Sequence, residues 1–442
     1  MAGESQEIRL GELVAQGALA ISDGYRVRNE ELGPSGIPFV RGGDIGDGWI
    51  DTDTVDHIRP EFASRVRPKL ARAGDVAFIT KGTVGRAGIL RLGQPDVVFA
   101  PQVAYWRVLA PDRLNSRFLF YLIRSRAFQS ALDGVKTHGA MVADYVSISQ
   151  QLDFAFSFPS LPVQRAIAHI LGTLDDKIEL NRRMSQTLEA MARALFKSWF
   201  VDFDPVRAKG EGRDPGVPQP LADLFSDRLV DSELGEIPEG WEVGCFGDVV
   251  EQLREQENPL SSSDVLFSHY SIPAFDGERW PRAELGESIK SQKSRVPPGA
   301  ILLSKLNPEI ERVWLVDVQP RERAVCSTEF LVLHARAPST RSYAYCLARS
   351  PLFRQQIEAL VTGTSKSHQR AHADTVLGLS AIRAPAPLVK AFDKCASSLL
   401  ERTLACRREI RTLANVRDAL LPKLISGDLR LKHAERFIVE VR

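Results

Sequence analysis

Residues 158–205 read FPSLPVQRAIAHILGTLDDKIELNRRMSQTLEAMARALFKSWFVDFDP. Along this stretch, apolar side chains recur every seven positions, interrupted once by an asparagine, at Ile167, Leu174, Asn181, Leu188 and Leu195. A heptad pattern sustained over five rungs is typical of a helix that packs along its length against a second helix. The stretch therefore predicts one helix on the order of 55 Å long.

The same pattern returns 225 residues later, at Phe392, Leu399, Cys406, Leu413 and Leu420. Other segments repeat at this offset, since SRAFQSAL at 125–132 matches SPLFRQQI at 350–357. The chain thus consists of two diverged copies of one unit, each a mixed segment followed by a long helix. We expect the two helices to pair in a coiled coil in which Asn181, opposite Cys406, sets the register. The alternative is that each helix packs along its own globular segment.

The mixed segments predict an α+β fold. In the first copy, strand composition is found at 75–80, 87–91, 97–99 and 103–108, followed by one helix over 115–132 that Asn115 or Ser116 would cap. The second copy repeats this with strands at 300–304, 313–316 and 330–333 and a helix near 341–360. Between the copies, 204–240 holds five Pro and five Gly, and predicts a surface connector in which Leu221, Leu224 and Phe225 anchor a short helix.

Composition excludes several classes of protein. The chain has 442 residues and a net charge of +1, so a nucleic-acid signal has to be local. Its five cysteines lie in the second half without a CxxC pair, which argues against a disulfide framework or a cysteine zinc site. The start of the sequence does not read as a signal peptide, and no run approaches the ~18 apolar residues of a membrane span. These features predict a soluble, cytoplasmic protein that does not enter a membrane.

Catalytic motifs are missing from the sequence. It contains no GxxxxGK[ST] phosphate loop, no GxSxG and no HExxH. His368 and His372 stand four apart, but no obvious third metal ligand accompanies them. We therefore predict no catalytic residue, no metal site and no cofactor bound by this chain.

Basic residues gather locally. Between 59 and 91 there are eight Lys or Arg against two acids, enough to hold several phosphates. Two kinds of loop in each copy could read base edges: 80–86 and 304–308, which follow a strand, and 136–139 and 364–370, which precede the last strand. Lys and Arg suit guanine and Asn suits adenine. The candidate DNA contacts are Arg41, Lys81, Thr83, Arg86, Lys136, His138, Lys305, Asn307, Lys366, His368 and Gln369.

Four stretches carry a resemblance to a known family. The run 158–205, with its Pro162-Val163-Gln164-Arg165-Ala166-Ile167 core, is similar to the central helical region of type I restriction-modification specificity subunits. GEIPEGWEVGCFGDVV at 235–250 resembles the opening of their second recognition domain. VRDALLPKLISGDLRL at 416–431 resembles the close of their distal helix, and LGEL at 10–13 the start of the first domain. The second copy departs from the pattern, because Ala386-Pro387-Leu388-Val389-Lys390 lacks the glutamine that Gln164 supplies in the first.

The resemblance implies a fold and a division of labour. Two similar α+β target-recognition domains would be separated by two long antiparallel helices that form a coiled coil, with an internal pseudo-twofold repeat. It divides the chain into a first recognition domain (1–160), a central helix (161–203), a linker (204–236), a second recognition domain (237–386), a distal helix (387–426) and a C-terminal tail (427–442).

The same resemblance implies function. The chain would be the non-catalytic specificity subunit of a phage-defence complex, with each domain reading one half of a split, asymmetric site in double-stranded DNA. The coiled coil would set the number of unread bases between the halves. Two adenine-methyltransferase subunits and restriction/translocase subunits would dock on it, and S-adenosylmethionine, ATP and Mg would be bound by those partners.

Three alternatives stay open at this point. The first is a stand-alone sequence-specific DNA-binding protein or regulator without methylase partners. The second is an enzyme, either a nuclease or a fused methyltransferase. The third is a coiled-coil scaffold with no role on DNA, which steep salt dependence of DNA binding would separate from the first.

Overall fold

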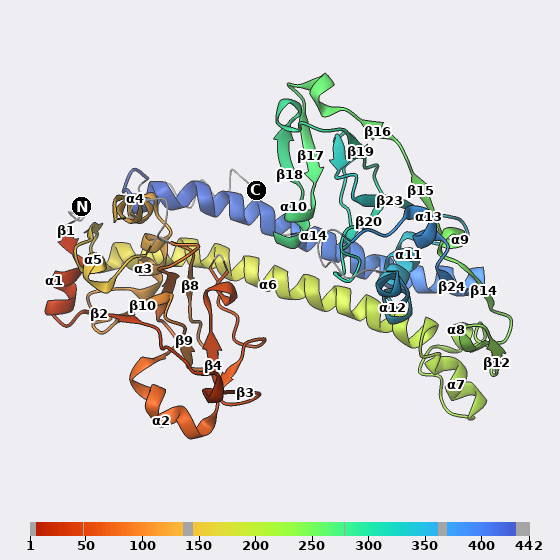
Figure 1. Cartoon of the computed structure of the whole chain (residues 1–442), viewed down its shortest axis with the longest axis horizontal. Helices are drawn as coiled ribbons and strands as arrows, with labels where there is room; N and C mark the ends of the chain where they lie inside the picture. Colours follow the sequence, from red (N-terminus) through yellow and green to blue (C-terminus); the bar gives the residue numbers. More distant parts are fainter. Residues whose placement is uncertain (1–5, 47, 136–144, 278, 361–368, 430–442) are drawn as a thin grey trace. The chain divides into compact units, whose positions relative to one another are not determined.

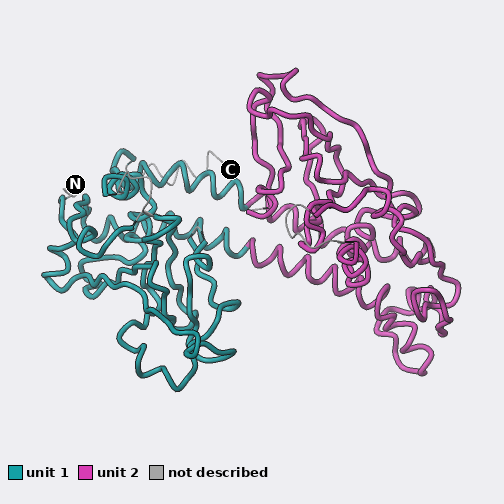
Figure 2. Tube along the Cα trace, viewed as in Figure 1, with its two compact units in different colours: residues 1–180, 410–442 teal, residues 181–409 magenta. Residues whose placement is uncertain are grey.

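The two predicted long helices are present in the computed structural model of the chain, which describes residues 6–46, 48–135, 145–277, 279–360 and 369–429. They are α6 (Leu161–Phe200) and α14 (Ala386–Ile425), each of 40 residues (Figure 1). The chain divides into two compact units (Figure 2). Unit 1 holds Met1–Leu180 and Ile410–Arg442, and unit 2 holds Asn181–Glu409, so each unit contains one half of each long helix.

Within unit 2 the two helix halves run antiparallel. Glu189 of α6 pairs with Arg407 of α14, and seven residues further along α6 the ring of Phe196 packs edge-on against Phe392, fifteen residues earlier in α14. In unit 1, Asp175 of α6 pairs with Arg417 of α14 inside one apolar cluster. The helix pairing predicted from the heptads is thus found in each unit.

The predicted seam positions differ in burial. Six are buried, namely Ile167, Leu174, Asn181, Phe392, Cys406 and Leu420, and four are half-buried, namely Leu188, Leu195, Leu399 and Leu413. Towards the end of α6 the buried stripe has moved onto Ser185, Glu189, Ala192, Phe196 and Trp199. A straight α-helix drifts about 20° per heptad relative to a strict seven-residue repeat, which accounts for the shift of the stripe away from Leu188 and Leu195.

Unit 1 is built on two sheets and a short ribbon. One sheet has the order β2-β10-β7-β8 and the other β3-β5-β4-β9-β6, while β1 pairs with β11. The strands are β1 (Gln6–Arg9), β2 (Leu19–Asp23), β3 (Leu32–Gly33), β4 (Ile37–Val40), β5 (His57–Ile58), β6 (Leu70–Ala71), β7 (Val76–Ile79), β8 (Ala87–Ile89), β9 (Val97–Phe99), β10 (Val103–Val108) and β11 (Ala155–Phe158). The four strands predicted in this copy are all found.

Unit 2 repeats this plan. Its sheets have the orders β15-β23-β20-β21 and β16-β19-β22-β17-β18, and β14 pairs with β24. The strands are β14 (Glu242–Cys245), β15 (Val250–Leu253), β16 (Gln256–Glu257), β17 (Leu266–Tyr270), β18 (Arg282–Leu285), β19 (Lys293–Arg295), β20 (Ile301–Ser304), β21 (Val313–Leu315), β22 (Ala324–Cys326), β23 (Phe330–Ala335) and β24 (Ser380–Arg383). Because β7 and β20 begin at 76 and 301, and α6 and α14 at 161 and 386, the offset of 225 recurs in the fold. The internal repeat is confirmed.

The helix predicted over 115–132 is wrong in one respect, because the structure breaks it into α3 (Ser116–Ile123) and α4 (Arg126–Val135). The hydroxyl of Ser125 bonds the carbonyl of Leu122 and accepts the N–H of Phe128, so it ends one helix and starts the next. The same break separates α11 (Arg341–Ala348) from α12 (Pro351–Ala359), where Ser350 caps the second helix and Pro351 opens it. The predicted cap at Asn115 is confirmed, since its side chain accepts the N–H of Phe118.

The connector between the copies is folded rather than extended. It forms α7 (Asp204–Gly210), α8 (Gln219–Ala222) and a hairpin of β12 (Leu229–Ser232) with β13 (Gly235–Pro238). Val206 and Phe225 are buried in the unit 2 core, while Leu224 stays exposed. The remaining α-helices of the described chain are α1 (Leu10–Ala15), α2 (Ala63–Val66), α5 (Ile148–Leu152), α9 (Phe246–Val249), α10 (Ile272–Gly277) and α13 (Ala373–Leu377). None of the described helices combines the length and hydropathy needed to cross a bilayer.

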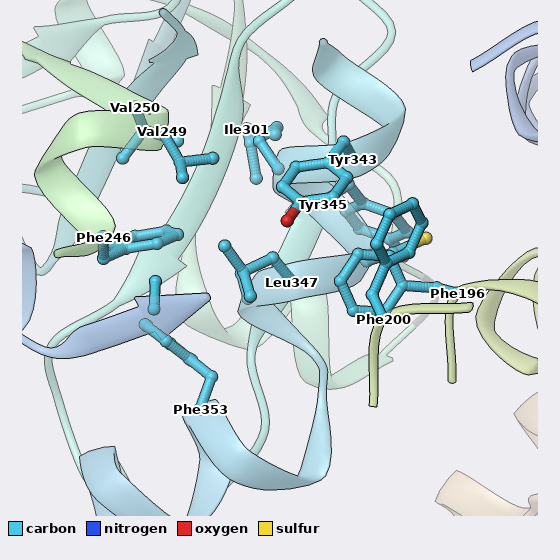
Figure 3. Packing of buried hydrophobic residues seen from close by; sticks show 14 of the residues in the cluster. Phe196, Phe200, Phe246, Val249, Val250, Ile301, Tyr343, Tyr345, Leu347 and Phe353 are labelled. Atoms are coloured by element: carbon cyan, nitrogen blue, oxygen red, sulfur yellow. The ribbon is translucent and has the colours of Figure 1, made fainter. Parts of the chain in front are cut away.

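The main core of unit 2 lies where α9, α11 and α12 meet the end of α6 (Figure 3). Phe196 and Phe200 pack against Tyr343 of α11, with ring centroids 5.3 and 5.0 Å apart. The ring of Phe246 of α9 packs at a tilt against Phe353 of α12, with ring centroids 4.6 Å apart. Aromatic packing therefore attaches the sheets of unit 2 to its half of the long helices.

Candidate nucleic-acid interface

The β7–β8 loop (residues 80–86) of unit 1 is held at its base by backbone bonds. The N–H of Thr80 donates to the carbonyl of Gln102 at 2.8 Å, and the N–H of Gly85 donates to that of Ile79 at 2.9 Å. Lys81 and Thr83 are exposed, and neither side chain bonds another described residue. The loop thus presents an ammonium and a hydroxyl to solvent from a fixed hairpin, as phosphate or base-edge contacts require.

Glycine is required at position 85 of this loop. Gly85 has φ +95°, and a Cβ there would lie 2.8 Å from Oε1 of Gln129 and 3.1 Å from Cδ1 of Leu132. A larger side chain would have to adopt a left-handed backbone and push aside the ends of the Gln129 and Leu132 side chains. The close approach of the loop to α4 is therefore built into the sequence.

In unit 2 the two kinds of loop predicted as DNA-reading segments lie beside each other, and in unit 1 the β7–β8 loop lies beside Tyr145 and Val146. In unit 1, Lys81 bridges Tyr145, and the N–H of Val146 donates to the carbonyl of Thr80 at 3.0 Å. In unit 2, Leu306 bridges Arg370, and the N–H of Ala371 donates to the carbonyl of Lys305 at 3.0 Å. Segments about 65 residues apart therefore form one edge. The candidates Lys136, His138, Lys366 and His368 lie outside the described residues.

The β20–β21 loop (residues 305–312) of unit 2 opens beside a pocket of about 420 Å³. Lys305 contributes to its wall, and its side chain makes no ion pair with a described residue. The other polar side chains of the wall are Gln252, Arg254, Gln256, Ser294, Thr328, His372 and Asp374. Arg254 is not among the sequence candidates, because it comes from a segment far from the loop, and His372 was considered in the sequence only as a metal ligand.

Asn307 corrects part of the sequence argument. Its φ is +48°, in the left-handed region that asparagine tolerates, and its N–H donates to the carbonyl of Gln369 at 2.8 Å. Its Oδ1 is buried without a hydrogen-bond partner in the described chain. A bidentate contact to adenine needs both Oδ1 and Nδ2, so this conformation does not offer one. The geometry favours a role for Asn307 in shaping the loop.

We expect Asn307→Gly to keep wild-type DNA discrimination and Asn307→Val to lower stability by about 1–2 kcal/mol, because only glycine adopts φ +48° freely. The check is urea unfolding together with DNA binding for both variants. Loss of adenine discrimination in the glycine variant would restore Asn307 as a base contact.

Two other candidates are held by the protein itself. Arg86 donates to the carbonyl of Ile45 at 3.2 Å, and Arg41 pairs with Asp56 at 2.7 Å. Arg41 also lies over the ring of Phe39. Gln369 contributes its carbonyl to the N–H of Asn307, as described above. These residues can still meet a phosphate, but DNA would have to compete with existing partners.

The basic cluster at 59–91 is partly neutralised by tertiary contacts. Arg65 pairs with the fully buried Glu31 at 2.8 Å, Lys69 pairs with Asp23, and Arg59 with Glu61. A backbone N–H of Arg28, with Tyr25 and Arg65, lowers the pKa of Glu31, so the carboxylate stays charged. Five cations of the cluster have no ion pair within the described chain, namely Arg67, Arg72, Lys81, Arg86 and Arg91.

In each unit a buried ion network attaches the sheets to the long helices. Neither of the two networks was visible in the sequence. In unit 1, Asp175 accepts from Tyr121 at 2.6 Å and pairs with Arg417 at 2.9 Å. Burial raises the pKa of Tyr121, so its hydroxyl stays protonated and donates. In unit 2, Glu189 takes the same part with Tyr345 and Arg407. Heptad reading counts such polar positions as interruptions and so gives no signal for them.

The comparisons with known proteins agree with this arrangement. Residues 4–190 match the family model of the type I restriction modification DNA specificity domain. The type I restriction enzyme MjaIX specificity subunit of Methanocaldococcus jannaschii is 23% identical over 406 residues, covering 88% of each chain. The type I restriction enzyme HindI specificity subunit of Haemophilus influenzae is 24% identical over 372 residues, covering 71% of this chain and 77% of the relative.

A solved structure supports the fold. The S subunit of a type I restriction-modification system from M. genitalium covers 96% of both chains with a TM-score of 0.56 at 13% identity. At this identity the likeness concerns the fold alone. In the described residues no group of three or more His, Cys, Asp or Glu side chains could hold a metal ion.

Proposed function

The chain belongs to the family of type I restriction-modification DNA specificity subunits, and from this premise we propose that each unit reads one half of a split, asymmetric DNA site. As a specificity subunit, the chain is a recognition component and not itself an enzyme. The observation that carries the proposal is the duplicated unit, which in both copies places a hairpin loop beside a segment about 65 residues further along the chain. Two copies whose loops differ in sequence suit two different half-sites.

The long helices support a second part of the proposal, that they set the number of unread bases between the half-sites. Each has 40 residues, or about 60 Å at 1.5 Å per residue, against about 34 Å for one turn of B-DNA. Each helix runs without interruption from one unit into the other. A rigid element of this length is suited to fixing a spacing that flexible linkers would not.

We further propose that two adenine-methyltransferase subunits and restriction/translocase subunits dock on this chain. The pseudo-repeat provides two similar docking surfaces, which suits two copies of one partner. S-adenosylmethionine, ATP and Mg would then be bound by the partners and not by this chain. The partners would also supply part of the contacts to DNA, which is consistent with the net charge of only +1 on this chain.

The proposal is tested by mapping modified adenines in host DNA with and without the gene. Loss of one split motif, with a fixed spacer, is the expected result and would reveal the target at the same time. If the map stays unchanged while the methyltransferase subunits are present and active, the chain acts as a stand-alone DNA-binding protein and the proposal fails.

Lys81→Ala and Lys305→Ala should each weaken binding at one half-site only, because the two side chains belong to different units. Removing one phosphate contact lowers the slope of log affinity against log salt concentration by about one. Removing a base contact lowers the discrimination between bases at one position of the site by roughly 1–3 kcal/mol. The measurement is DNA affinity against salt for the two variants, with DNA substituted in either half-site.

Lys394→Ala is the matched control, since Lys394 is an exposed lysine on α14 outside both loops. It should leave both half-sites and the salt slope unchanged. If Lys81→Ala and Lys305→Ala instead prevented assembly with the methyltransferase subunits, the assignment of these loops to DNA would be wrong.

A further inference from the structure

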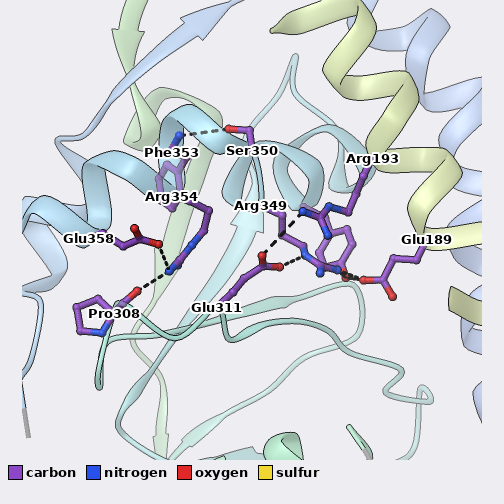
Figure 4. A network of polar contacts seen from close by, with 10 residues as sticks. Glu189, Arg193, Pro308, Glu311, Arg349, Ser350, Phe353, Arg354 and Glu358 are labelled. Carbon is purple, nitrogen blue, oxygen red and sulfur yellow. Dashed lines mark hydrogen bonds and ion pairs between the residues drawn. The ribbon is translucent and has the colours of Figure 1, made fainter. Parts of the chain in front are cut away.

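The β20–β21 loop of unit 2 is attached to the long helices by a chain of charged side chains (Figure 4). Glu311, near the end of this loop, pairs with Nε of Arg349, which lies directly after α11. Arg193 of α6 approaches the second carboxylate oxygen of Glu311 at 3.9 Å. The loop that carries Lys305 therefore touches α6 through one carboxylate.

Arg349 connects this series of charged side chains to the pair of long helices. Its Nη1 pairs with Glu189 of α6 and lies 2.7 Å from the hydroxyl of Tyr345. The other carboxylate oxygen of Glu189 pairs with Arg407 of α14 at 2.7 Å. Arg349 and Glu189 are only 7% and 9% exposed, so water screens this part of the chain weakly.

A second contact holds the same loop from α12. Nη2 of Arg354 donates to the carbonyl of Pro308 at 2.6 Å and also pairs with Glu358 at 3.1 Å. Arg349 and Arg354 flank Ser350, where α11 gives way to α12. Two arginines from one helix junction thus grip the loop on both sides of Glu309 and Ile310, which are exposed.

Unit 1 lacks the loop carboxylate of this arrangement. Its β7–β8 loop reads TKGTVGR at 80–86 and contains no acid. Arg86 takes the place of Glu311 at the offset of 225 and donates to the carbonyl of Ile45. The helix anchor itself is shared, since Tyr121, Asp175 and Arg417 form the network described above. A loop carboxylate that links the anchor to the reading loop is therefore a feature of unit 2, since residues 80–86 hold none.

We propose that Glu311 and Arg349 are positioning residues that fix the β20–β21 loop relative to the helix pair and thereby set how unit 2 reads its half-site. The inference rests on the proposed function, because it needs that unit to read DNA. Neither residue has to touch a base. Their effect is to hold Lys305 and its neighbours where they can contact a base edge or a phosphate. Loosening the link should therefore lower the discrimination between DNA sequences more than the overall affinity for DNA.

The test uses the full chain in complex with its methyltransferase subunits and DNA of the mapped target. Affinity is measured for the target and for DNA with single substitutions in each half-site. Glu311→Ala should lower discrimination about tenfold in the half-site that Lys305→Ala also affects, the scale of one good base contact. Glu311→Gln, which still accepts a hydrogen bond from Arg349, should lose less. The other half-site and the salt slope should stay at the wild-type values.

Glu257→Ala is the control, since Glu257 is a part-buried glutamate of unit 2 that pairs with Arg323 and does not line the pocket beside Lys305. It should leave discrimination unchanged. The Glu311→Ala variant should fold, because Arg349 keeps its ion pair with Glu189. If that variant does not fold, the result for Glu311→Gln decides whether the inference holds. A similar loss in both half-sites, or a uniform loss for all DNA sequences, would overturn the inference. If wild-type complex reads no split site, the proposed function fails instead, and that result is seen before any variant is made.

Discussion

Replacing Glu189 by alanine should lower the free energy of unfolding of unit 2 by about 3–5 kcal/mol, the cost of removing one partner from a buried ion network. Glu189 is buried and accepts from Arg349, Arg407 and Tyr345. Its loss would leave the part-buried guanidinium of Arg407 without its carboxylate partner and would leave the buried guanidinium of Arg349 with Glu311 alone. This is the largest stability effect that we expect from a single substitution.

Tyr345 does not compensate for the missing carboxylate. Burial raises the pKa of Tyr345 to about 12, so at neutral pH its hydroxyl is an uncharged donor. It cannot supply the negative charge that both arginines need. The destabilisation should therefore persist across the neutral range of pH.

Unfolding should be followed by hydrogen exchange of peptides from α11 and the second half of α6, because a chain of two units need not unfold in one step. Glu401→Ala is the matched control, since Glu401 is an exposed glutamate of α14 in the same unit. It should change the free energy by no more than about 0.5 kcal/mol. A loss below about 1 kcal/mol for Glu189→Ala would mean that the network is not the anchor described above.

Inserting four residues into both long helices should lengthen the unread spacer by about two base pairs and leave both half-sites unchanged. One insertion follows Leu180 in α6 and the other follows Glu409 in α14, where the chain passes between the units. Four residues add about 6 Å to a helix, and one base pair of B-DNA occupies about 3.4 Å. The original motif should lose methylation almost completely, because the complex can no longer meet both half-sites at once.

The measurement is the methylome of a host that carries the inserted gene. A gene with the insertion in α6 alone is the control, and it should support little methylation at either spacing, since the apolar stripes of the two helices would be displaced by one turn. A spacer that stays at its original length in the double insertion would refute the role of the helices in spacing.

Much of the architecture could be predicted from local patterns. The heptads located both long helices, the 225-residue offset revealed the repeat, and β-branched and aromatic runs located β7 to β10. The helix over 115–132 was wrong because hydrophobic spacing continues through Ser125, while the break depends on a hydroxyl that bonds its own backbone. Composition predicts a surface segment for the connector, because it does not show that Val206 and Phe225 find an apolar partner.

The candidate site was predicted in outline, and the DNA contacts themselves stay predictions. Loops 80–86 and 304–308 were chosen for glycine, lysine and asparagine, and Lys81 and Lys305 are free of ion pairs within the described chain. The basic cluster was overcounted, because Glu31 and Asp23 belong to other strands and turns and neutralise Arg65 and Lys69. Asn307 was chosen for its amide, whose oxygen the fold buries.

The two-copy plan, the long helices and most of the strands follow from the amino-acid order alone, because periodicity and repetition involve residues near one another in the chain. Which cations have no ion pair, and that Glu311 is linked through Arg349 to Glu189, emerges from the folded chain. An ion pair or a strand bridge depends on distance in space, which local patterns do not encode. Glu189 and Arg407 are 218 residues apart in the chain yet form a salt bridge of 2.7 Å.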